Sequence, residues 1–185
     1  MGEQHKKHNR REHLNDFHLN IAGEYVYDGA LYACQSDDAK QRRSKRAVWG
    51  MAAILTVAVA AGGCIPAPGM QNCFYVLLPY LGEVVAAASV VWALAKLGMD
   101  WGTVREYNYK KSVAVLPVRT AVTAVFSLLG IVCELIFFFV NDHAGQTFFA
   151  LLYVLLKLIA LLSVLVLRAE IMQAEWDKLP KKNNF

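Results

Sequence analysis

Four long apolar segments constrain the fold of this chain more than any other feature of its sequence. They cover about residues 47–64, 73–97, 116–140 and 147–167, and most charged residues lie between or outside them. A helix needs roughly 20 apolar residues to cross a bilayer core of about 30 Å, because each residue adds about 1.5 Å. Each segment is close to that length or longer. We therefore predict an all-α integral membrane protein that forms a four-helix bundle.

The positions of the basic residues predict how the bundle is oriented. The links at 65–72 and 141–146 contain no Lys or Arg, whereas the leader, the link at 98–115 and the tail all contain them. Cytoplasmic segments of membrane proteins carry the excess of Lys and Arg. The N-terminus, the C-terminus and the middle link are therefore expected in the cytoplasm, and the plasma membrane is the expected location.

The chain divides into a basic cytoplasmic leader at 1–46, the four-span bundle at 47–168 and a cytoplasmic tail at 169–185. The tail is predicted to be helical, since its residues favour a helix up to Pro180. In the leader, two β-favouring runs flank Asp28 and Gly29, and an Asp-Gly link is a common signal for a tight turn. This pattern favours a small β-hairpin at 24–33. A disordered linker that touches the lipid headgroups through its tyrosines is the alternative.

The basic run before the first span predicts a contact with lipid. Arg42, Arg43, Lys45 and Arg46 come directly before the first apolar segment. A basic residue near an anionic membrane surface gains about 1 kcal/mol. We expect these four residues to contact anionic lipid; the alternative is that they only set the orientation. Nucleic acid is not an expected partner, because the basic residues flank membrane segments.

Three ionisable residues lie inside the apolar segments: Glu83, Glu134 and Lys157. Each costs a few kcal/mol in the middle of a membrane, so each should face the interior of the protein and find a partner. Glu83 and Lys157 both lie about ten residues, or roughly 15 Å, from the outer ends of their segments, and Glu134 lies roughly 9 Å deep. We therefore predict a buried ion pair between Glu83 and Lys157. Glu134 is either protonated or the third member of the cluster.

The same cluster supports two different functions. Pro79 lies one turn before Glu83 and removes a helical hydrogen bond on the same face. Interrupted helices beside a carboxylate often form ion sites near the middle of transporters. Pro79, Glu83, Glu134 and Lys157 are thus candidate residues for binding a substrate or an ion. The other interpretation is that the charges only fix how the helices pack.

Cys64 and Cys73 bracket the first outer link and can form a disulfide on an oxidising side of the membrane, or remain free thiols. The sequence contains no phosphate-binding glycine loop, zinc-binding helix motif or nucleophile elbow. No enzymatic activity, cofactor or metal is therefore expected. The favoured function is an accessory or interaction subunit that binds another membrane protein or further copies of itself. The alternative is a small transporter or channel for protons, cations or a polar solute.

Overall fold

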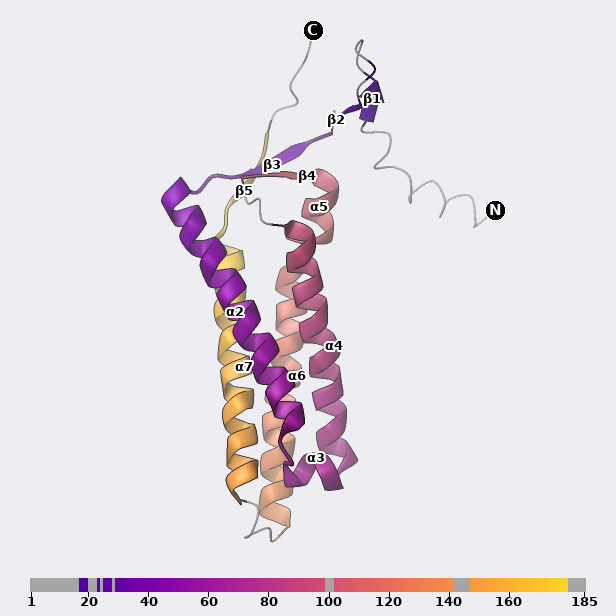
Figure 1. The fold of residues 1–185 in the computed structure, drawn as a ribbon, viewed down its shortest axis with the longest axis vertical. Helices are drawn as coiled ribbons and strands as arrows, with labels where there is room; N and C mark the ends of the chain where they lie inside the picture. Colours follow the sequence, from indigo (N-terminus) through magenta and orange to yellow (C-terminus); the bar gives the residue numbers. More distant parts are fainter. Residues whose placement is uncertain are drawn as a thin grey trace, which may run out of the picture.

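The computed structural model describes residues 17–19, 23, 25–27, 29–98, 102–141 and 147–179. Within this part of the chain, four long helices run side by side, with small strands at one end (Figure 1). Each of these helices is long and apolar enough to cross a membrane. The prediction of four helices that could span a membrane is therefore confirmed. The long helices are α2 (Asp38–Cys64), α4 (Phe74–Leu97), α6 (Leu116–Val140) and α7 (Thr147–Gln173).

The outer surface of the bundle is apolar, as a lipid-facing surface must be. Large hydrophobic side chains are exposed on every long helix, among them Val57 on α2, Val85 on α4, Val118 on α6 and Leu162 on α7. In a water-soluble protein such a continuous apolar surface would promote association. In a bilayer it faces hydrocarbon, and the helices satisfy their own backbone hydrogen bonds.

Each helix packs closely against its neighbours around the bundle. α2 packs against α7, α7 against α6, and α6 against α4, whereas contact between α2 and α4 is sparser. The half of the bundle nearest the strands has an apolar core. Its buried residues are Val48, Ala52, Val90, Ala93, Leu94, Leu97, Val104, Val113, Leu116, Leu167 and Ile171. The opposite half is closed by the short helix α3 (Pro68–Asn72), and there buried charged residues lie among apolar ones such as Val76 and Phe137.

The helix bounds agree with the predicted spans most closely at α4 and α6. α2 begins earlier, at Asp38, so that the end of the predicted leader is part of the helix. The reason is composition, because the basic run before the first span consists largely of good helix formers. α7 continues past the predicted span to Gln173. A further short helix, α5 (Glu106–Lys111), lies in the middle link.

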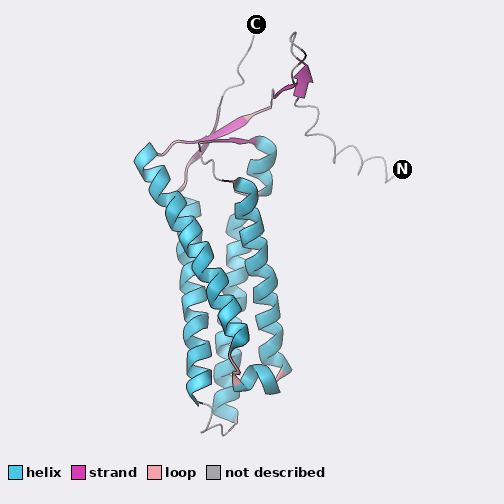
Figure 2. Ribbon diagram, viewed as in Figure 1, coloured by secondary structure: helices cyan, strands magenta, loops and turns pink. Residues whose placement is uncertain are grey.

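A three-stranded antiparallel sheet, which we call the cap, lies at one end of the bundle (Figure 2). Its central strand is β3 (Leu31–Cys34), with β4 (Thr103–Arg105) on one side and β5 (Trp176–Lys178) on the other. Tyr32 stacks on Tyr109 with ring centroids 4.1 Å apart, and Tyr109 in turn contacts Trp176. The leader, the middle link and the tail therefore meet in one small structure.

The cap corrects two predictions. The mostly helical chain contains a three-stranded sheet, whereas a hairpin at 24–33 was the β structure expected. The tail is helical only to Gln173, because residues 176–178 form β5. Helix propensity in the tail is outweighed by pairing with β3 and by the packing of Trp176 against the apolar core. The described part of the tail ends at residue 179.

The predicted hairpin at 24–33 is also wrong in its pairing. Both of its β-favouring runs are strands, β2 (Tyr25–Tyr27) and β3, but they do not pair with each other. β2 pairs with β1 (Phe17–Leu19), while β3 pairs within the cap. An isolated two-stranded hairpin is marginally stable, and β3 gains two partners in place of one. Asp28, the first residue of the predicted turn, lies outside the described residues.

Candidate functional site

The three ionisable residues of the apolar segments are buried in the half of the bundle closed by α3. Glu83 on α4 and Glu134 on α6 are 0% exposed, and Lys157 on α7 is 1% exposed. Helical spacing explains their orientation. Other buried residues lie one turn before and after each of them, as on α7, where Tyr153 and Ala160 flank Lys157. The three ionisable residues therefore lie on the helix faces that are buried in the bundle interior.

Glu83 and Lys157 form a direct ion pair, as their matched depth predicts. The Lys157 ammonium donates a hydrogen bond to Oε2 of Glu83. Ser127 on α6 donates to the other oxygen, with 2.6 Å between Ser127 Oγ and Glu83 Oε1. Both carboxylate oxygens thus have a partner, and one buried group joins α4, α6 and α7.

Aromatic rings enclose the Lys157 ammonium. Its nitrogen lies 4.6 Å from the ring centroid of Tyr80 and 5.1 Å from that of Tyr153. The negative face of an aromatic ring attracts a cation, most strongly where water is excluded. Tyr80 also reaches α2, since its hydroxyl donates to the Val59 carbonyl over 3.3 Å. All four long helices therefore contribute to the surroundings of the ion pair.

Tyr80 and Tyr153 were not among the predicted site residues, although the sequence held a signal for them. Tyr80 comes three residues before Glu83, and Tyr153 comes four residues before Lys157. Residues at these spacings share one face of a helix. An aromatic residue at such a position is common in any apolar span, so the signal could not distinguish these two tyrosines from the others.

Glu134 does not join the ion pair. Its Oε1 accepts a long hydrogen bond from the backbone N–H of Gly69 in α3, with 3.4 Å between the two atoms. Its Oε2 is buried and has no hydrogen-bond partner among the described residues. α3 approaches this closely because residue 69 is glycine, since a Cβ there would lie 2.9 Å from Glu134 Cδ. The predicted three-membered cluster is therefore a pair with a separate carboxyl nearby.

Pro79 and the two cysteines lie around this site without entering the ion pair. Pro79 is buried on the same face of α4 as Glu83, but α4 continues through it from Phe74 to Leu97. The interrupted helix that Pro79 suggested is therefore not formed. Cys64 and Cys73 lie at the ends of the link that contains α3 and are not bonded to each other in this structure. Their disulfide stays a prediction.

The chain matches no protein-family model, and no curated protein or solved structure matches it either. Functional inference therefore depends on the buried charges and on the surface of the bundle.

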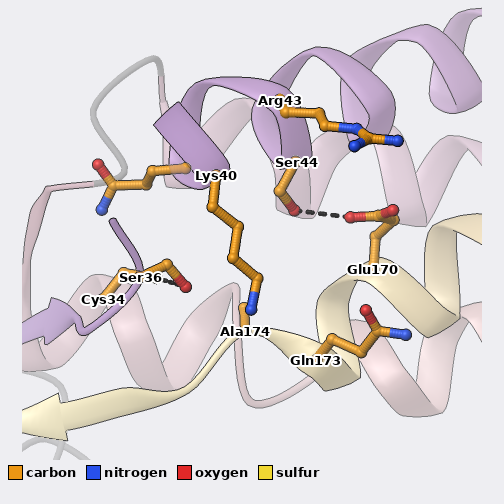
Figure 3. Close-up of a pocket in the computed structure, with 9 residues that line it drawn as sticks. Cys34, Ser36, Lys40, Arg43, Ser44, Glu170, Gln173 and Ala174 are labelled. Carbon is orange, nitrogen blue, oxygen red and sulfur yellow. Dashed lines mark hydrogen bonds between the residues drawn. The ribbon is translucent and has the colours of Figure 1, made fainter. Parts of the chain in front are cut away.

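The predicted lipid-binding residues divide between two surface clefts. Arg42, Lys45 and Arg46 line a groove of about 670 Å³ together with Trp49. Arg43 instead lines a separate cleft of about 240 Å³ between α2 and α7, with Lys40, Ser44 and Glu170 (Figure 3). There Ser44 donates a hydrogen bond to Glu170 over 2.8 Å. Residues 42, 45, 46 and 49 have the spacing of one helix face, so the groove combines three basic groups with an aromatic ring.

We expect the groove to prefer anionic lipid, and Trp49 provides the means to measure this. Brominated anionic lipid should quench Trp49 fluorescence more than brominated zwitterionic lipid does, with the W49F variant subtracted to isolate its signal. At about 1 kcal/mol for each basic residue, replacing Arg42, Lys45 and Arg46 together with Gln should lower this preference more than tenfold. Arg43→Gln is the matched control, since Arg43 faces the other cleft. An equal loss with Arg43→Gln would contradict a site in the groove.

Proposed function

We propose that this chain is a non-enzymatic interaction subunit of a cytoplasmic membrane, in which a fixed four-helix frame presents the cap to a partner. The observation that carries this proposal is the buried ion pair between Glu83 and Lys157. Both side chains are at most 2% exposed and bond each other directly. A pathway for ions or solutes needs its charged groups to exchange with water. A pair held in this way instead resists rearrangement, because separating it leaves two uncompensated buried charges.

The ion pair is suited to fixing the packing of the helices. Apolar side chains alone give little preference for one arrangement of helices in lipid, since the lipid tails are equally apolar. A hydrogen-bonded pair between α4 and α7, with Ser127 from α6 added, is satisfied in only one register. This supports a rigid frame in preference to a moving carrier.

The cap is the surface that we propose for the partner. The links at the α3 end are short, so that end offers little surface outside the membrane. At the other end, three segments of the chain combine in the β4-β3-β5 sheet, which the basic residues predict to lie in the cytoplasm. A partner is either a second copy of this chain or another membrane protein.

Photo-crosslinking in native membranes tests this proposal. A photoreactive residue in place of Thr103, which is exposed on β4, should give a discrete crosslinked product whose mass identifies the partner. The same residue in place of Gln71, which is exposed on α3 at the other end, should give none. Crosslinking that is equal at both positions, or absent from Thr103, would contradict a partner at the cap.

Reconstitution separates this function from the alternative, a small transporter or channel. Liposomes that contain the purified protein should show the same proton and cation leak as liposomes without protein. A flux that the wild type produces and Glu83→Gln abolishes would contradict the interaction subunit and favour the transporter. Glu134 is the residue that supports the transporter alternative, because it is a buried carboxyl that is not part of the ion pair.

A further inference from the structure

Two polar groups deep in the bundle have no hydrogen-bond partner among the described residues. They are Oε2 of Glu134 and the hydroxyl of Tyr153, and both residues are 0% exposed. Buried polar groups in native proteins are nearly always paired, so each unpaired group requires a specific explanation. Two of them in the same part of one small bundle point to a common cause.

Glu134 and Tyr153 lie at the same level of two neighbouring helices. Gly130 on α6 packs against Lys157 on α7, where a Cβ on residue 130 would lie 3.6 Å from Lys157 Cε. Glu134 lies one turn beyond Gly130 toward the α3 end, and Tyr153 lies one turn beyond Lys157 in the same direction. α6 and α7 pack closely against each other. The two unpaired groups are thus adjacent in height, under α3.

The charges around Glu134 do not balance if it is ionised. The Lys157 ammonium already bonds Glu83, and that pair is neutral as a unit. α3 contributes only the Gly69 backbone N–H, at 3.4 Å. Among the described residues, the remaining titratable groups that act on this site or on Tyr153 carry no positive charge: Tyr75 and Tyr80 from α4, Cys133 from α6, and Cys73 at the start of α4. Tyr80 also faces Cys64 at the end of α2. An ionised Glu134 would leave one negative charge uncompensated in the membrane interior.

We propose that Glu134 is a buried proton-binding site, held as a neutral carboxylic acid at the level of the Tyr153 hydroxyl. One proton on the carboxyl removes the negative charge that would otherwise be uncompensated. A metal ion fits the position less well, because hard cations take about six or more oxygen ligands and the described residues contain no group of three or more His, Cys, Asp or Glu side chains that could hold one. The site is separate from the ion pair, and it holds its proton whether or not the protein moves one.

Infrared spectroscopy of the full-length purified protein tests the proposal directly, because a carboxylic acid and a carboxylate have different C=O stretching bands. At neutral pH, in lipid, the wild type should show the band of one buried protonated carboxyl, and Glu134→Gln should lose it. Glu134→Asp, which keeps the carboxyl, should retain a band at a shifted frequency. Tyr153→Phe should shift the wild-type band, because it removes a buried polar hydroxyl at the same level of the bundle. Glu170→Gln is the control, since this carboxylate lies in the cleft near the cap and its loss should leave the band unchanged.

Two results would overturn the proposal. One is a spectrum in which folded wild type and Glu134→Gln show no difference in the protonated carboxyl region. The other is a band that appears only when Na⁺ and K⁺ are removed, which would mean that a metal cation occupies the site. Tyr153→Phe keeps Glu134 intact, so the band shift can be measured even if the Glu134 variants do not fold. These spectra do not depend on crosslinking at the cap or on flux through liposomes. The proton-binding site and the proposed function are therefore tested independently.

Discussion

Replacing Lys157 with Met should destabilise the bundle by about 3–5 kcal/mol, because Glu83 would be left as a buried carboxylate without its cation. Glu83 and Lys157 are 0% and 1% exposed, so water cannot replace the lost partner without entering the core. The change should appear as a lower free energy of unfolding in detergent micelles. It should be accompanied by a loss of compact protein when the chain is heated.

The double variant Glu83→Gln/Lys157→Met gives the sharper comparison. It removes both charges, so it should recover much of the stability lost in Lys157→Met, since no unpaired ion remains. Lys110→Met is the matched control. Lys110 pairs with Glu106 at 2.6 Å but its side chain is 67% exposed, so its removal should cost less than about 1 kcal/mol. If Lys157→Met costs no more than Lys110→Met, the buried pair does not stabilise the frame.

Gly82→Val should also destabilise the bundle, by about 1–3 kcal/mol, because α4 and α6 are in close contact at this residue. A Cβ on Gly82 would lie 2.8 Å from Cδ1 of Phe126, well inside normal contact, and valine adds two methyl groups to it. The same unfolding measurement applies, with a crosslink between cysteines on α4 and α6 to report their separation.

Gly50→Ala is the control for the Gly82 substitution. A Cβ on Gly50 would meet no atom within 4 Å, so this change carries only the gain in helix propensity and should leave stability equal or slightly higher. Adding Phe126→Ala to Gly82→Val should restore part of the loss, because it removes the ring that clashes. Equal stability of the Gly82 and Gly50 variants would show that α4 and α6 can separate without cost.

The membrane helices and the ion pair could be predicted because both follow from local pattern and chain geometry. Segment length gives the number of spans, and counting residues from the segment ends gives the depth of Glu83 and Lys157. The partner of Glu134 could not be predicted in this way. Counting residues gives the depth of a side chain in the bundle but not the direction in which its helix face points. That direction brings the Lys157 ammonium to Glu83 and places Glu134 against Gly69.

The cap was missed for a different reason. Its strands are three or four residues long and come from three segments that are far apart in the sequence. Thr103 and Val104 favour a strand, but a stretch of three residues is too short to mark one by pattern. Residues 176–178 follow a helix in residues that favour helix. Only the pairing with β3 selects the extended conformation. The Asp-Gly pair correctly indicated strands on both of its sides. It wrongly predicted that β2 and β3 pair with each other.

The cap has a mechanical consequence for the first and last membrane helices. β3 leads within a few residues into α2, and α7 leads within a few residues into β5, while β3 and β5 are hydrogen-bonded to each other. A tilt of α7 therefore pulls on the beginning of α2 through a single backbone ladder. Force applied at the cap end of either helix is transmitted to the other through this ladder. A chain cut after Gln173 would lose the ladder and keep only the direct packing of α2 against α7.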